Sequence, residues 1–86
     1  MNINELITIV KKKLNHNIDI DNIEVEDKSF LHKNHKSNQV GKFHLKIILY
    51  STELNKMSKI ESNKKIYKIL SDEMRDYIHS IQILIH

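Results

Sequence analysis

The chain has 86 residues with no cysteine, no proline, one glycine and a formal net charge of +3. This length supports one hydrophobic core, so we expect a single domain over residues 1–86. The lack of cysteine excludes disulfides and thiolate metal sites, and no apolar run reaches the roughly 18–20 residues that cross a bilayer. Because the N-terminus also lacks the apolar segment of a signal peptide, we expect a cytoplasmic protein without membrane contact.

The positive charge has to be weighed against codon usage. A basic protein is a candidate for nucleic-acid binding. However, isoleucine, asparagine and lysine together supply 37 of the 86 residues. A/T-rich codons produce such a bias without any functional pressure, so overall basicity is weak evidence for a nucleic-acid partner.

The first part of the chain predicts a helix followed by a strand. Apolar residues over residues 2–15 recur with the spacing of one helix face, at Ile3, Leu6, Ile7, Val10 and Leu14. Asn2 or Asn4 could cap the start of this helix. Residues 22–27 then alternate with period two, which predicts a half-buried strand with Ile23 and Val25 facing inward.

A second strand is predicted after a long connection. Residues 30–41 have no stable period and contain the only glycine, which favours a functional or mobile loop. Residues 42–51 alternate again, and we expect them to pair antiparallel to the first strand. Their inward face consists of Phe43, Leu45, Ile47 and Leu49.

The last third predicts helix and then strand. From Glu53 to Ile78 the spacing is helical: a short first piece precedes a longer helix that Ser58 or Ser62 could cap. The stripe of the longer helix is Ile66, Ile69, Leu70, Met74 and Ile78. Residues 80–85 alternate as a closing strand. The order α-β-β-α-β predicts an α/β (α+β) fold, with a three-stranded sheet and helices packed on one face.

Histidine is the side chain best suited to chemistry in this chain. His32 and His35 lie three residues apart on the predicted loop, His44 follows, and His79 begins the last alternating run. Neutral imidazoles could converge on a metal ion from these positions. The alternative for all of them is a solvated surface histidine, and His79 could instead be a structural residue that ends the helix.

Lysines form the densest charged group, and no catalytic pattern accompanies them. Lys59, Lys64, Lys65 and Lys68 could lie along nucleic-acid phosphates, although a solvated helix face is favoured. The sequence has no nucleophile elbow, no paired catalytic carboxylates and no glycine-rich phosphate loop. We therefore expect a protein that is not an enzyme.

Three parts of the sequence, in order, resemble the BolA family. They are residues 23–29 (IEVEDKS) followed by His32, residues 43–47 (FHLKI) followed by Ser51, and residues 64–70 (KKIYKIL) followed by residues 78–81 (IHSI). The resemblance covers nearly the whole chain. It implies a fold like the type II KH domain without the GxxG loop that binds RNA.

The resemblance also implies a function. Similar proteins are non-enzymatic partners of monothiol glutaredoxins, with which they share a [2Fe–2S] cluster that also involves glutathione. One ligand is the C-terminal histidine, which is His79 here; the second comes from the loop, where His32 matches best and His35 is the substitute. The isolated protein is expected to be a monomer without a cluster.

The BolA resemblance also carries an alternative function, that of a DNA-binding transcriptional regulator that uses the helix at residues 59–70. The family usually has Arg-His-Arg at the start of this helix, where this chain has Ser62, Asn63 and Lys64. That departure weakens the case for DNA as a partner, although Lys59, Lys64, Lys65 and Lys68 could restore the charge.

Overall fold

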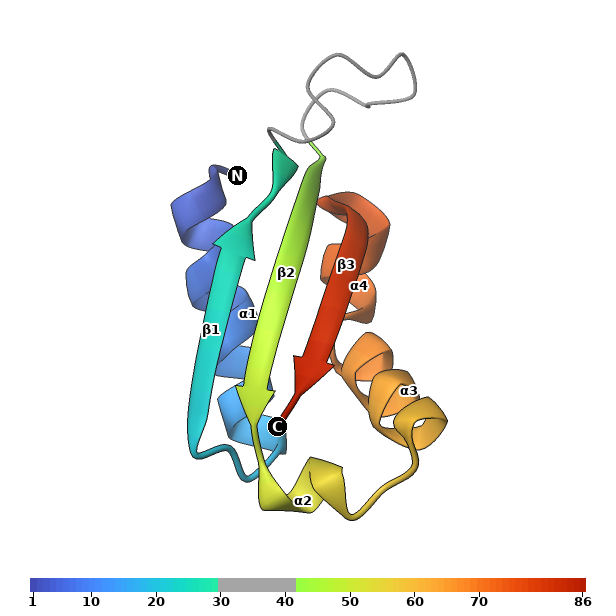
Figure 1. The fold of residues 1–86 in the computed structure, drawn as a ribbon. Helices are drawn as coiled ribbons and strands as arrows, with labels where there is room; N and C mark the ends of the chain where they lie inside the picture. The colour runs from blue at the N-terminus through green and yellow to red at the C-terminus, as the bar shows by residue number, and fades with distance from the viewer. Residues whose placement is uncertain (30–41) are drawn as a thin grey trace.

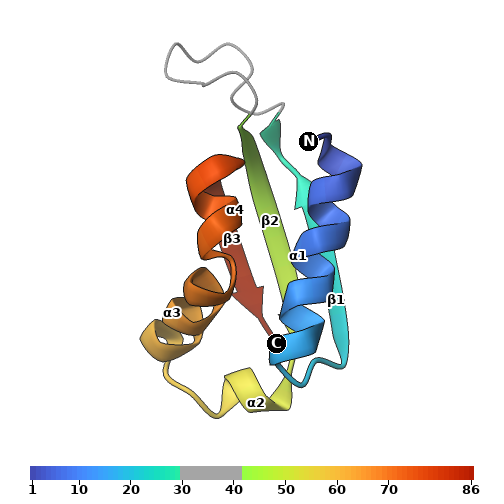
Figure 2. The same cartoon turned by 180° about the vertical axis from the view of Figure 1, so that it is seen from behind.

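The computed structural model describes residues 1–29 and 42–86. The elements are α1 (Ile3–Asn17), β1 (Asn22–Asp27), β2 (Phe43–Tyr50), α2 (Thr52–Asn55), α3 (Lys59–Ile69), α4 (Ser71–Asp76) and β3 (Ile78–Ile85). The strands form one sheet in the order β1-β2-β3, with α1, α3 and α4 on one face of it (Figure 1, and from behind in Figure 2). The predicted α+β class is confirmed; the predicted loop, residues 30–41, lies outside the described residues.

Reciprocal capping fixes where two of the helices begin. The Glu5 amide donates to Asn2 Oδ1 at 2.9 Å, and Asn2 Nδ2 donates to Glu5 Oε1 at 3.0 Å. Ser58 and Glu61 make the same exchange at the start of α3, at 3.1 and 3.0 Å. Each cap side chain satisfies a backbone N–H that has no partner inside the helix, and the glutamate in turn accepts from the cap side chain. Asn2 and Ser58 are therefore the caps, whereas Ser62 is buried within α3.

The register of the sheet places one set of side chains toward the helices. β1 pairs antiparallel with β2, as predicted, with Val25 opposite Ile47. β3 pairs parallel with β2, with Ile83 opposite the same Ile47. A parallel return requires a long crossover, which the segment with α2, α3 and α4 supplies. The predicted inward faces of the strands pack against one core.

That core lies between the sheet and the helices. Its buried apolar side chains are Leu6, Val10, Leu14, Ile18, Leu45, Ile47, Leu49, Leu54, Ile66, Leu70 and Ile78. Nearly all of them belong to the apolar faces predicted from the sequence. Within the described ranges, no helix combines the length and the apolarity needed to cross a membrane.

The prediction of one long helix ending at Ile78 was wrong. Leu70, with φ −96° and ψ 18°, separates α3 from α4. Ile78 belongs to β3, where it pairs with Phe43, so the strand begins two residues before the predicted position 80. The apolar spacing continues through both helices, and a break at a single buried residue leaves that spacing unchanged.

Candidate functional site

His79 lies at an irregularity in the edge strand of the sheet. Phe43 pairs with Ile78, and the next residue of β2, His44, pairs with Ser80. His79 is thus the extra residue of a β-bulge and has no opposite residue on β2. Bulges of this kind redirect a side chain and are frequent beside functional sites. The side chain of His79 is exposed at this point, where a partner molecule can reach it.

A second histidine packs against His79. The ring centroids of His44 and His79 are 4.8 Å apart, and the rings are tilted by 57°. His44 is only 6% exposed. Its Nδ1 lies 2.6 Å from Ser80 Oγ, and its backbone N–H donates to Ser29 Oγ at 3.0 Å. Both the main chain and the ring of His44 are therefore held in place.

His44 and Ser80, the neighbour of His79 in the chain, line a hollow beside the bulge. The helices leave one face of the sheet uncovered (Figure 1). The alternation of β2 directs Leu45 toward the core, so His44 and Lys46 face the other way. The hollow has a volume of about 350 Å³, and its polar lining includes Lys28, His44, Lys46, Ser80 and Gln82. This face offers a partner imidazole, ammonium, hydroxyl and amide groups.

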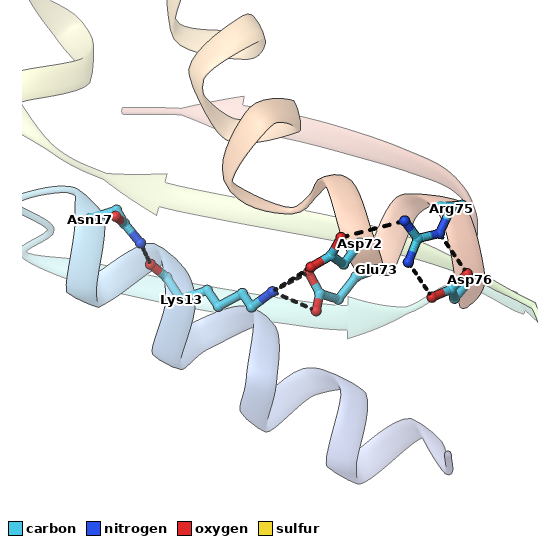
Figure 3. A network of polar contacts seen from close by, with 6 residues as sticks. All are labelled: Lys13, Asn17, Asp72, Glu73, Arg75 and Asp76. Atoms are coloured by element: carbon cyan, nitrogen blue, oxygen red, sulfur yellow. Dashed lines mark hydrogen bonds and ion pairs between the residues drawn. The ribbon is translucent and has the colours of Figure 1, made fainter.

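An ion pair between two helices fixes the position of α4, the helix that leads into β3 (Figure 3). Lys13 Nζ on α1 donates to both carboxylate oxygens of Glu73 on α4, at 2.9 and 2.8 Å. Glu73 is only 6% exposed, and a charge buried to this degree is costly unless it is paired, so the ion pair with Lys13 stabilises it. Asp72 lies 4.0 Å from the same ammonium group.

The end of α4 is tied to the start of β2. Lys42 Nζ donates to the carbonyl of Arg75 at 3.2 Å, and the Phe43 N–H donates to the carbonyl of Tyr77 at 2.9 Å. Arg75 also bonds Asp76 at 2.9 Å, and this hydrogen bond lowers the pKa of Asp76 below its ordinary value (Figure 3). The contacts of Lys42 and Phe43 hold the end of α4, and with it the start of β3, beside the first residues of β2.

The structure describes one of the three predicted ligands. His79 is exposed on the edge strand, whereas His32 and His35 lie outside the described residues. Among the residues that are described, no three His, Cys, Asp or Glu side chains are grouped so that they could hold a metal ion. A [2Fe–2S] cluster needs four protein or thiol ligands. Of the ligands predicted for such a cluster, the described residues therefore include His79 alone and do not make up a full set.

Sequence reasoning missed the contact between His44 and His79. The two residues are far apart in the chain, and only the strand register brings them together. One signal was present: two polar residues, His79 and Ser80, separate the inward-facing Ile78 and Ile81, where regular alternation would place one. This spacing indicates a bulge.

The predicted lysine site divides into two parts. Lys59, Lys64 and Lys68 are exposed on α3, with the last two on one face at the i and i+4 positions. Lys65 instead donates to Glu53 Oε2 at 3.0 Å. This hydrogen bond, together with one from the Asp19 amide, lowers the pKa of Glu53. Lys65 is thus part of a local ion pair.

A cleft adjoins the start of α3 at the far end of β3. It has a volume of about 310 Å³ and is lined by Leu54, Asn55, Met57, Lys59, Ser62, Asn63, Ile83, Leu84 and Ile85. Ile85 lies six positions after His79, which is roughly 20 Å along a strand. Ser62 is buried, with its hydroxyl donated to the Lys59 carbonyl at 3.0 Å. At this position the chain does not present the cation of the family pattern.

These features define a class: small α+β proteins with a mixed three-stranded sheet, helices on one face and an exposed histidine on the edge strand. The family described as BolA-like protein matches residues 14–86, and the chain belongs to this family. A curated relative from Haemophilus influenzae, "DNA-binding transcriptional regulator BolA", is 24% identical over 75 residues, which cover 87% of this chain and 70% of the relative.

Two solved structures have the same fold. The BolA domain of SufE1 from Arabidopsis thaliana superposes with a TM-score of 0.77 at 26% identity, and the similarity covers 91% of this chain and 86% of that domain. BolA1 from the same plant has a TM-score of 0.76 at 20% identity, with the same coverage. The predicted family resemblance is therefore confirmed.

Proposed function

We propose that this BolA-family protein is a non-enzymatic partner of a monothiol glutaredoxin and shares a [2Fe–2S] cluster with it in iron–sulfur homeostasis. The observation that supports this most directly is the exposed imidazole of His79 on a bulge of the edge strand. His79 offers an accessible donor atom, and the described residues alone do not complete a ligand set, which is compatible with a cluster held between two proteins. Glutaredoxin and glutathione supply the thiolate ligands in this proposal.

The chemistry of the donor supports a role in transfer or sensing. Imidazole is a neutral ligand, whereas thiolate carries a negative charge. Histidine ligation therefore raises the reduction potential of a cluster and makes its stability sensitive to protonation. His79 would hold the iron, and the second ligand would be His32, with His35 as the substitute.

The first test is anaerobic cluster reconstitution with a monothiol glutaredoxin and glutathione, followed by visible absorption and circular dichroism. We expect a spectrum that differs from that of the glutaredoxin homodimer and saturates at a one-to-one ratio of the two proteins. His79→Ala should abolish this spectrum, because an alanine supplies no donor atom. The free energy of unfolding should change by less than about 0.5 kcal/mol, since the side chain is exposed.

A matched control is His16→Ala, which removes an exposed histidine from the end of α1. This variant should form the mixed cluster normally. His32→Ala and His35→Ala tested in parallel identify the second ligand. A full spectrum with His79→Ala would show that His79 is not a ligand, and no spectrum with the natural sequence would refute cluster sharing.

A second candidate function, transcriptional regulation through DNA binding, rests on a different surface. Lys59, Lys64 and Lys68 are exposed on α3, and the Haemophilus influenzae relative is named a DNA-binding regulator. Because the cleft at Lys59 and the bulge at His79 adjoin opposite ends of β3, both functions could belong to one molecule. Ser62 and Asn63 contribute no cation here, which makes this the weaker candidate.

Fluorescence anisotropy with specific and random duplex DNA at several salt concentrations tests this second function. Phosphate contacts make the logarithm of the affinity fall linearly with the logarithm of the salt concentration. The double variant Lys64→Gln/Lys68→Gln should reduce that slope by roughly 2, about one for each contact removed. Lys12→Gln, an exposed lysine on α1, is the control. Equal affinity for specific and random DNA would exclude a sequence-specific regulator.

A further inference from the structure

The bulge leaves the side chain of His79 with few constraints from the sheet. The residue has no opposite partner on β2, and it is exposed. An exposed imidazole on such a strand can occupy several rotamers. Binding to a metal fixes one of them, and the lost freedom weakens the affinity. A contact that orders the ring beforehand would remove this loss.

His44 provides such a contact. It is 6% exposed, its backbone N–H is bonded to Ser29 Oγ at 3.0 Å, and its Nδ1 lies 2.6 Å from Ser80 Oγ. Ser29 is fixed in turn by its N–H, which donates to Asp27 Oδ1 at 2.9 Å. The ring of His79 rests against this fixed ring, with 4.8 Å between the centroids.

We propose that His44, held by Ser80, is a positioning residue that keeps the His79 imidazole in the orientation from which it binds iron. The inference rests on the proposed function, because that function makes His79 a ligand. In this arrangement His44 acts on the metal only through His79. Ser80 holds the ring of His44 through its hydroxyl and acts on the ring of His79 only through His44.

The test compares the natural sequence with Ser80→Ala and His44→Ala by nuclear magnetic resonance of the free protein. We expect contacts between the ring protons of His44 and His79, and one dominant side-chain rotamer for His79. Both variants should show rotamer averaging at His79. In cluster reconstitution, both should bind the glutaredoxin-held cluster roughly three- to tenfold more weakly and with altered circular dichroism, as expected for the loss of order in one side chain.

His86→Ala is the matched control, because His86 stacks on Tyr50 at the other end of the strands, with 5.0 Å between the ring centroids. It should leave the His79 rotamer and the cluster unchanged. Because Ser80 is exposed, we expect Ser80→Ala to keep the fold, and this variant tests the inference even if His44→Ala fails to fold.

The outcomes separate this inference from the proposed function. A single His79 rotamer together with natural cluster affinity in Ser80→Ala would overturn the positioning role and leave the proposed function intact. If the natural sequence forms no mixed cluster, both proposals fail, whatever the resonance data show. Averaging at His79 with weakened cluster binding, confined to the two site variants, would support the role of His44.

Discussion

Glu73 is a carboxylate with little access to solvent, and it is paired with the ammonium group of Lys13. Its side chain is 8% exposed, while that of Lys13 is 36% exposed. A buried charge is tolerated when it is paired and becomes costly when its partner is removed. The pair therefore holds α4 against α1 and sets the direction in which the chain enters β3.

We expect Lys13→Ala to lower the free energy of unfolding by about 1–3 kcal/mol, because it leaves the Glu73 carboxylate without a partner. Urea denaturation measures this difference. The double variant Lys13→Met/Glu73→Leu should recover most of the loss, since it removes both charges. Lys12→Ala, on the exposed side of α1, is the control. An equal loss in the single and double variants would contradict this explanation.

At the level of elements, α2 and α3 are joined by a pair that depends on pH. The hydrogen bond from Lys65 and, to a smaller degree, that from the Asp19 amide lower the pKa of Glu53 below its ordinary value of 4.5. The unfolded chain therefore takes up this proton first as the pH falls. The stabilisation is fully present above pH 4.5 and is lost as the pH falls through the folded-state pKa.

Glu53→Gln should be less stable than the natural sequence at pH 7, and this difference should shrink as the pH falls below 4.5. Urea denaturation between neutral and acid pH at low salt provides the measurement. Both side chains are partly exposed, so added salt should reduce the effect. Glu24→Gln, an exposed change on β1, is the control. A difference that stays constant across this range would rule out the pair as its source.

The sequence predicted the elements more accurately than their ends. The spacing of apolar residues located α1 and β1, because this signal is local. The helix caps are local as well, and Asn2 and Ser58 have the expected capping bonds. The break at Leu70 could not be predicted, because this residue is buried and keeps the apolar spacing. The same limit applies to the site. His79 could be selected from its position in the chain, but its contact with His44 depends on the register of strands that are remote in sequence.

At the level of the whole molecule, β2 is the element on which the others depend. It is the central strand, paired antiparallel on one side and parallel on the other. Its inward residues Leu45, Ile47 and Leu49 are almost fully buried. A strand with this many contacts opens only when the domain unfolds.

Native-state hydrogen exchange should therefore distinguish the central strand from the edge strands by the exchange rates of their amides. The amides of Ile47 and Leu49 should exchange with the same free energy and urea dependence as global unfolding. The outward-directed amides of the edge strands β1 and β3 should exchange faster, because no strand among the described residues pairs with them. Fast exchange at Ile47 under conditions where the domain is folded would show that the sheet opens locally.

The bulge at His79 shifts by one residue the positions of β3 that face the core. Ile78 is an even-numbered core residue, whereas Ile81, Ile83 and Ile85 are odd-numbered, and all four lie on the core side. Excision of His79 alone would place Ser80 between Ile78 and Ile81, which restores strict alternation and keeps every isoleucine inward. The hydrophobic core could thus be built from a chain one residue shorter. Packing alone does not account for the extra residue, and what the protein gains from it is an imidazole at the edge of the sheet.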